Sequence, residues 1–162
     1  MRIEKLMKNW LKTTLDKGII MPPMSWFIYG IITILLVVVY GKYRCVYINS
    51  HKDYLEDELF ENSNKYGLDG WSITHLVAHM ILGYLFPTTF ILSQIGGIIW
   101  ELFECYIGNT TPDWYYGIGF CENRLPGKDN YKVWCYGKIS DIFVNILGFI
   151  IGVFLNFLLL KK

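Results

Sequence analysis

Histidine, carboxylate and amide side chains recur at helical spacing in three apolar segments of the chain. They form three pairs: His75 and His79, Glu101 and Glu104, and Asp141 and Asn145. Residues three or four positions apart share one face of a helix, with Cβ atoms about 5 to 6 Å apart, so each pair can act on one atom. A charge at the centre of a bilayer costs about 3 kcal/mol, and such residues usually face a bundle interior. Three helices with these pairs therefore predict one shared polar site.

The residue types in this predicted site suit a metal-dependent reaction. Imidazole and carboxylate groups together form a ligand set for zinc, iron or manganese. We predict one divalent metal held by His75, His79, Glu101 and Asp141, with Glu104 as general base and Asn145 as a catalytic residue that binds substrate or Asp141. Two alternatives stay open: a metal-free acid/base or proton-relay site, and a set of hydrogen bonds that only holds the helices together.

The composition predicts that this site lies in a membrane protein. The chain is 53% hydrophobic and 17% aromatic, with a mean hydropathy of +0.31, above an ordinary soluble domain. Four apolar stretches, about 19–40, 73–86, 88–107 and 139–160, predict an all-α integral membrane bundle of four transmembrane helices in one domain, 19–162. The predicted helices alternate in direction, which brings all three polar pairs to the same leaflet.

The two middle stretches are short for crossings of roughly 20 residues each. Pro87 separates them and predicts a tight hairpin, because proline lacks an amide donor and steers its predecessor away from the α conformation. A single kinked helix or a re-entrant pair is the alternative. Ser72 is the predicted N-cap of the second helix. Below the polar pairs the same helical faces continue as glycine, at Gly83, Gly97, Gly148 and Gly152, which predicts close helix packing.

The first 18 residues predict an amphipathic helix. The apolar positions Ile3, Leu6, Met7, Trp10, Leu11 and Leu15 recur opposite Lys5, Lys8 and Lys12. We expect this segment to lie on an anionic membrane surface before Pro22 and Pro23 redirect the chain, with packing on a partner protein as the alternative. The formal net charge of +1 and the scattered basic residues argue against nucleic-acid binding.

The loops opposite the termini carry residues that bear on orientation. The lysines and arginines near both termini favour a cytoplasmic location for the two chain ends. With four spans, the cysteines Cys45, Cys105, Cys121 and Cys135 all fall on the other side, where they are candidates for disulfides, although free thiols are the alternative. Asn109 begins an N-glycosylation sequon. The aromatic segment 109–138 suits either an interfacial belt or a lid over the polar site.

Part of the chain resembles a known family. The resemblance runs from about residue 73 to 153 and rests on His79, on the W-E-x-x-E pattern ending at Glu104, and on D-x-x-x-N-x-x-G-x-x-x-G from Asp141 to Gly152. These patterns resemble VanZ-like membrane proteins, and an uncharacterised bacterial inner-membrane group shows a similar signature. The family usually has glutamine where this chain has Glu104, and a short arginine-bearing loop before the aspartate. The resemblance implies the fold and the site more than a reaction.

These observations together favour an enzyme that acts on a lipid. The hypothesis is a VanZ-like hydrolase or transferase, metal-assisted or acid/base, whose substrate is a lipid or lipid-linked molecule. Its partners would then be membrane lipids, and self-association into oligomers is compatible with a chain of this size. The alternative is a non-enzymatic membrane scaffold. An ion or proton conductor is a weaker alternative, because the fourth apolar stretch has few polar residues below the site that could carry ions across.

Overall fold

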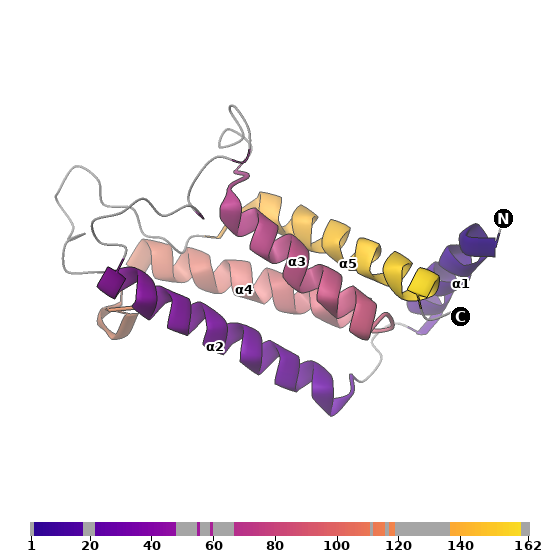
Figure 1. The fold of residues 1–162 in the computed structure, drawn as a ribbon, viewed down its shortest axis with the longest axis horizontal. Helices are drawn as coiled ribbons and strands as arrows, with labels where there is room; N and C mark the ends of the chain where they lie inside the picture. Colours follow the sequence, from indigo (N-terminus) through magenta and orange to yellow (C-terminus); the bar gives the residue numbers. More distant parts are fainter. Residues whose placement is uncertain are drawn as a thin grey trace.

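The computed structural model describes residues 2–17, 22–47, 55, 59, 67–110, 112–115, 117–118 and 137–159. Within these ranges every regular element is a helix: α1 (Arg2–Lys17), α2 (Met24–Tyr47), α3 (Gly70–Leu85), α4 (Phe90–Thr110), the short 3-10 helix η3 (Asp113–Tyr115) and α5 (Ile139–Leu159). Helices α2 to α5 lie along the long axis of the molecule and alternate in direction (Figure 1). Helix α1 lies at the end of the bundle where α5 finishes.

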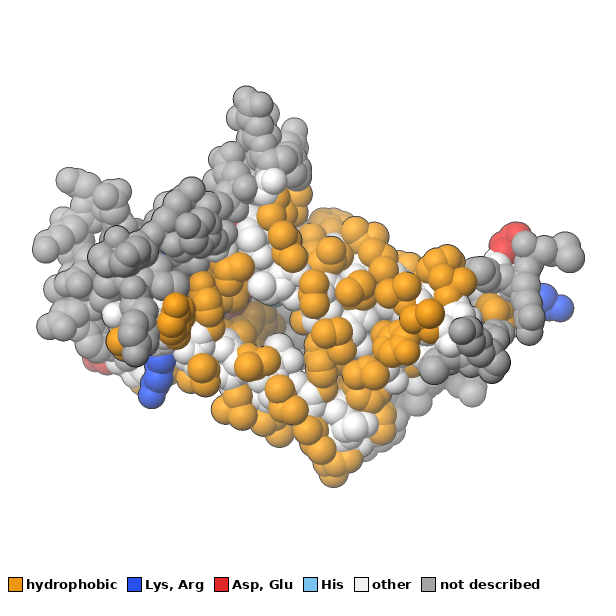
Figure 2. Space-filling model, viewed as in Figure 1, with side chains coloured by type: hydrophobic (Ala, Val, Ile, Leu, Met, Phe, Trp, Pro, Cys, Tyr) orange, Lys and Arg blue, Asp and Glu red, His pale blue; other side chains and the backbone are white. Residues whose placement is uncertain are grey.

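Three of these helices are long and apolar enough to cross a membrane: Met24–Val46, Phe90–Thr110 and Ile139–Leu159. Apolar side chains cover the middle of the visible face, between the two ends of the bundle (Figure 2). Helix α3 has 16 residues and rises about 24 Å, which is short of the roughly 30 Å hydrocarbon layer. The all-helical fold is as predicted, and three helices meet the requirements for a span.

Helix α2 differs from the predicted stretch 19–40 at both ends. It begins at Met24, directly after Pro22 and Pro23, and its first turn closes where the Trp26 amide donates to the Pro23 carbonyl at 2.9 Å. Proline is tolerated at a helix start because that amide would be unpaired anyway. The helix continues past the predicted end to Tyr47, since Gly41 and Arg44 are buried within the fold.

Helix α3 begins at Gly70 and is capped by Asp69, whereas Ser72 was the predicted cap. The Asp69 carboxylate accepts from the Ser72 amide at 3.2 Å, and the Asp69 amide donates to the Ser72 hydroxyl at 3.4 Å. This reciprocal capping box satisfies two amide groups of the first turn. The prediction was wrong because Asp69 and Ser72 are both good capping residues, and the geometry selects the earlier one.

A tight turn at Pro87 separates α3 from α4, as the sequence predicted. The Phe86 amide donates to the Leu82 carbonyl at 2.8 Å, and both the amide and the hydroxyl of Thr89 donate to the Phe86 carbonyl, at 3.0 and 2.9 Å. The helices on either side of this turn, α3 and α4, run in opposite directions (Figure 1). The alternative of one kinked helix therefore does not hold.

Glycines set the distance between α3 and α5. A Cβ atom on Gly83, Gly148 or Gly152 would overlap a backbone carbonyl of the facing helix, that of Phe149, Leu76 and Met80 respectively. The two backbones therefore touch, as the glycine pattern predicted. Beside this contact, Leu82, Phe149 and Val153 form a buried cluster. The contact also fixes the rotation and axial register of α3 against α5, on which the polar site depends.

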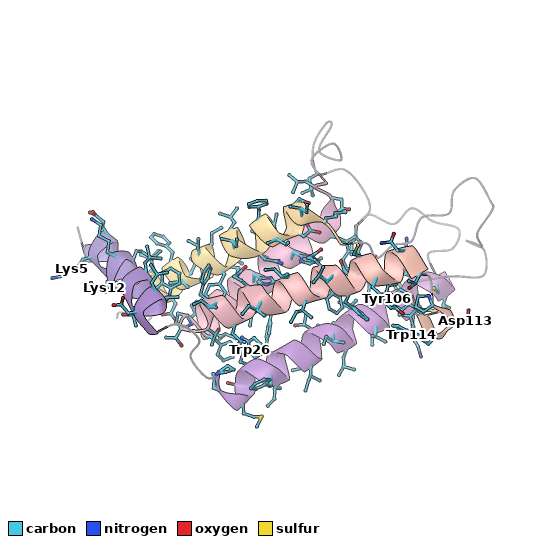
Figure 3. All side chains as sticks on the ribbon, turned by 180° about the vertical axis from the view of Figure 1, so that it is seen from behind. Lys5, Lys12, Trp26, Tyr106, Asp113 and Trp114 are labelled. Atoms are coloured by element: carbon cyan, nitrogen blue, oxygen red, sulfur yellow. The ribbon has the colours of Figure 1, made fainter. Side chains whose placement is uncertain are left out.

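Helix α1 packs across one end of the bundle. Trp10 lies against the buried cluster and against Phe90, and its indole nitrogen donates to the Pro87 carbonyl at 2.6 Å. Lys5 and Lys12 are exposed on α1, at the end of the molecule opposite Trp114 (Figure 3). The segment is thus a helix with a packed side and a basic exposed side.

Candidate functional site

Helices α3, α4 and α5 bring the predicted polar pairs to one end of the bundle. His75 lies in the second turn of α3, Glu101 and Glu104 lie in the second half of α4, and Asp141 and Asn145 lie in the first two turns of α5. Because the three helices alternate in direction, these positions share one level. The residues come from segments far apart in the sequence, so their meeting depends on helix packing.

The centre of this site is a cluster of His75, Glu101 and Glu104. Each of the three side chains offers one ligand atom, and these atoms all lie within 4.8 Å of one another. The His75 Nδ1 atom lies 3.5 Å from Oε1 of Glu101. Such spacing allows all three groups to contact one ion, and oxygen and imidazole nitrogen ligands suit a divalent transition metal.

Glu101 is held in place by a hydrogen bond from outside this cluster. Its side chain is buried, with 5% of the residue exposed. The Oε2 atom accepts the backbone amide of Lys138 at 2.8 Å, whereas Oε1 is buried with no hydrogen-bond partner among the described residues. A buried carboxylate oxygen without a hydrogen bond is costly. Glu101 therefore has one oxygen fixed by the protein and one directed at the cluster.

Asn145 contacts the same ring nitrogen of His75 that lies near Glu101. The Oδ1 atom of Asn145 lies 3.1 Å from His75 Nδ1, and Asn145 itself is 1% exposed. Because an amide oxygen can only accept, this hydrogen bond places a proton on Nδ1, so that a metal ion would bind His75 through the lone pair of Nε2. Partners of this kind orient metal-binding histidines in known sites.

Two of the predicted metal ligands make contacts of their own outside this cluster. Asp141 is buried and accepts from the Ser72 hydroxyl at 2.7 Å, which ties α5 to α3. His79 lies one turn deeper on α3, where its Nδ1 atom faces the His75 carbonyl at 3.2 Å. The structure thus brings His75 and Glu101 together with Glu104, the predicted general base.

Gly97 makes room for the side chains below the cluster. A Cβ atom at this position would lie 3.0 Å from Nδ2 of Asn145 and 3.3 Å from Nε2 of His79. Both nitrogens therefore approach the backbone of α4 where it lacks a side chain. The Asn145 Nδ2 atom is buried and has no hydrogen-bond partner among the described residues.

Asp69 and Lys138 contribute to the site, although the sequence analysis assigned neither of them to it. The Lys138 ammonium group pairs with the Asp69 carboxylate, and the Lys138 amide holds Glu101. The preceding Gly137 lies so close to α4 that a Cβ atom would overlap the Glu101 carbonyl. The available signals were the D-x-x-S spacing of Asp69 and Ser72, and a lysine directly before α5. Neither signal identifies a partner that is distant in sequence.

Three further predicted positions, Cys45, Cys105 and Asn109, lie at the same end of the molecule. Cys45 is disulfide-bonded, and its sulfur lies 3.7 Å from the Ile118 carbonyl oxygen. Cys105 is an exposed free thiol, whereas the candidates Cys121 and Cys135 lie outside the described residues. Asn109 is exposed in the last turn of α4.

Only part of the aromatic segment 109–138 falls within the described residues. There the Trp114 ring stacks on Phe103 with centroids 6.2 Å apart, and Tyr115 is buried against Ile107. Trp114 and Tyr106 lie at the same end as Asp113 (Figure 3). Comparison with known protein families, with curated proteins and with solved structures finds no match for this chain.

Proposed function

We propose that this protein is a VanZ-like membrane enzyme that uses one divalent metal to hydrolyse, or to transfer a group from, a lipid or lipid-linked substrate. The observation that carries the proposal is the cluster of His75, Glu101 and Glu104, in which one buried oxygen of Glu101 lacks a hydrogen bond. A cation between the two carboxylates would offset both their mutual repulsion and the burial of that oxygen.

The three clustered side chains would hold the metal, which supplies Lewis acidity and activates water when bound. Asn145 keeps His75 in one tautomer, and the Lys138 amide keeps Glu101 in one orientation. Asp141 acts through Ser72 to hold α3 and α5 in register. In this arrangement Glu104 is a ligand, and Asp141 is a positioning residue.

The same proposal includes four membrane-embedded helices with α1 at the surface. Helix α3 is short, but it packs backbone to backbone against α5, which suits a protein-covered membrane helix. Disulfides persist in oxidising compartments, so the bonded Cys45 favours a non-cytoplasmic location for the site end. The exposed lysines of α1 then face the cytoplasm together with both termini.

The first test is the metal content of the purified protein after incubation with zinc or manganese and gel filtration. We expect about one equivalent per chain, lost in Glu101→Gln and in His75→Ala. The matched control is Asp113→Asn, which removes an exposed carboxylate outside the cluster. Loss of metal with an unchanged elution profile supports the proposal. Absence of metal from the natural sequence, or equal metal in all variants, overturns it.

A second candidate function, a non-enzymatic scaffold, is favoured by the pairing of polar groups across helices. Ser72 with Asp141, His75 with Asn145 and Lys138 with Asp69 each join two segments of the bundle. In a scaffold, Glu101→Gln changes the unfolding temperature but binds no less metal than the natural sequence. The same purified samples therefore separate the two functions.

A further inference from the structure

Gly97 lies on the side of α4 that faces the polar site. It precedes Glu101 by one helical turn, and residues four positions apart share a helix face. A Cβ atom on Gly97 would lie 3.0 Å from Nδ2 of Asn145 and 3.3 Å from Nε2 of His79. Both distances are shorter than an ordinary van der Waals contact of about 3.5 to 4.0 Å. A side chain at this position would therefore press on two polar groups of the neighbouring helices.

The place of the Asn145 amide against α4 is explained by its other end. Its Nδ2 atom is buried and has no hydrogen-bond partner among the described residues, so no bond of its own draws this atom toward Gly97. The Oδ1 atom lies 3.1 Å from Nδ1 of His75. The side-chain amide is planar by the same resonance as a peptide group. An amide that presents Oδ1 to His75 therefore carries Nδ2 with it to the backbone of α4.

The two neighbours of Gly97 have little freedom to move away from it. Asn145 is 1% exposed, so protein atoms surround it on nearly every side. His79 is also buried, and its Nδ1 atom faces the His75 carbonyl at 3.2 Å. Close-packed interiors have low compressibility and transmit strain. A methyl group on Gly97 would thus turn or shift the Asn145 amide and disturb its hydrogen bond with His75.

We infer that Gly97 is a positioning residue for the candidate metal site, because the absence of a side chain there lets Asn145 orient the ring of His75. The effect passes from the backbone of α4 through an amide on α5 to a histidine on α3. This inference deepens the proposed function and rests on it for the role of His75 as a metal ligand. The orientation of the His75 ring rests on the contacts alone.

The test compares Gly97→Ala with the matched control Gly96→Ala. A Cβ atom on Gly96 would have no neighbour within 4 Å among the described residues, so the control adds the same methyl group to the same helix without a contact. The first measurement is NMR of metal-free protein labelled with ¹⁵N-histidine, at a pH where imidazole is neutral. The ring nitrogens of His75 are assigned by their loss in His75→Gln. We expect the Nδ1–H tautomer alone in the natural sequence and the control, and a mixture with the Nε2–H tautomer in Gly97→Ala.

The second measurement is the affinity for zinc or manganese, by competition with a chelator. We expect Gly97→Ala to bind the metal about tenfold more weakly, at the lower end of the loss caused by removing a partner that orients a histidine. Gly96→Ala should match the natural sequence. In an Asn145→Ala background the new methyl group has no amide to displace, so Gly97→Ala should cause no further loss. The same double variant should fold if Gly97→Ala alone does not.

A second His75 tautomer in Gly97→Ala but not in the control supports the inference. It is overturned by a single tautomer in both variants, by a loss of affinity that is undiminished in the Asn145→Ala background, or by a double variant that fails to fold like the single one. The two proposals fail in different ways. Absence of metal from the natural sequence removes the enzyme and leaves the tautomer result standing, whereas metal held equally tightly in Gly97→Ala removes the role of Gly97.

Discussion

Glu101 shows how a single residue can link the fold to the chemistry. One of its oxygens is held by the amide that precedes α5, and the other lies near His75. Any shift of α5 therefore moves the carboxylate relative to its neighbours. The site is accordingly sensitive to residues that never touch the cluster, and two residue-level predictions follow from this coupling.

Ser72→Ala is expected to destabilise the protein. The Ser72 hydroxyl is the donor to the buried Asp141 carboxylate and also accepts in the capping box of α3. An unpaired buried polar group costs about 1 to 3 kcal/mol, so the unfolding temperature in detergent should fall. Thr110→Ala serves as control, because that exposed hydroxyl donates to the Tyr106 carbonyl of its own helix. Equal unfolding temperatures for the two variants would contradict the assigned role.

Asn145→Ala is expected to weaken metal binding without removing a ligand. Loss of the partner that orients a metal-binding histidine typically costs 10- to 100-fold in affinity, which competition with a chelator would measure. The control is Asn156→Ala on the same helix. Asn156 donates to the Tyr84 carbonyl at 2.7 Å, far from the cluster, and its loss should affect stability alone. An unchanged affinity in Asn145→Ala shows that His75 needs no such support.

At the scale of elements, the contact between α3 and α5 should be the least tolerant part of the bundle. In Gly152→Ala the new methyl group meets the Met80 carbonyl and cannot be accommodated by a side-chain movement. We expect destabilisation of at least about 1 to 3 kcal/mol, as for overpacked cores. Gly96→Ala should instead stabilise α4 by up to about 1 kcal/mol, since alanine is the better helix former and the position is open. Unfolding in a denaturing detergent measures both variants, and a similar response from the two would refute close packing.

Helix α1 should depend on Trp10 for its position. Trp10→Ala removes the hydrogen bond to the Pro87 carbonyl and the edge contact with Phe90. A loss of about 1.4 kcal/mol in docking free energy raises the undocked fraction tenfold, so trypsin should cleave after Lys8 and Lys12 about tenfold faster. Leu11→Ala is the control, because Leu11 is half exposed. Identical cleavage rates would indicate that other contacts hold α1.

At the scale of the whole molecule, the two ends of the bundle should face opposite sides of the membrane. Lys12 and Asp113 lie at these two ends (Figure 3). In a Cys105→Ser background, Lys12→Cys and Asp113→Cys should react with a membrane-impermeant maleimide from opposite sides of sealed vesicles. The background variant alone gives the baseline. Labelling of both positions from one side would overturn the four-span arrangement.

Composition and helical spacing were sufficient to predict the helices, the turn at Pro87 and the end of the bundle at which the polar pairs gather. Apolar runs and proline act locally, so they can be recognised without knowledge of partners. The predicted helix bounds were wrong where two local signals compete, as at Asp69 and Ser72, and where helix α2 extends beyond its apolar run.

Which polar groups meet depends on helix rotation and axial register. These are set by backbone contacts at Gly83, Gly148 and Gly152, between helices far apart in the sequence. Those contacts bring the Asp141 carboxylate within hydrogen-bond distance of the Ser72 hydroxyl, and they place His75 beside Glu101 and Asn145. Spacing along one helix carries no information about rotation against another. The candidate residues were therefore readable from the sequence, whereas their pairing is a property of the packed bundle.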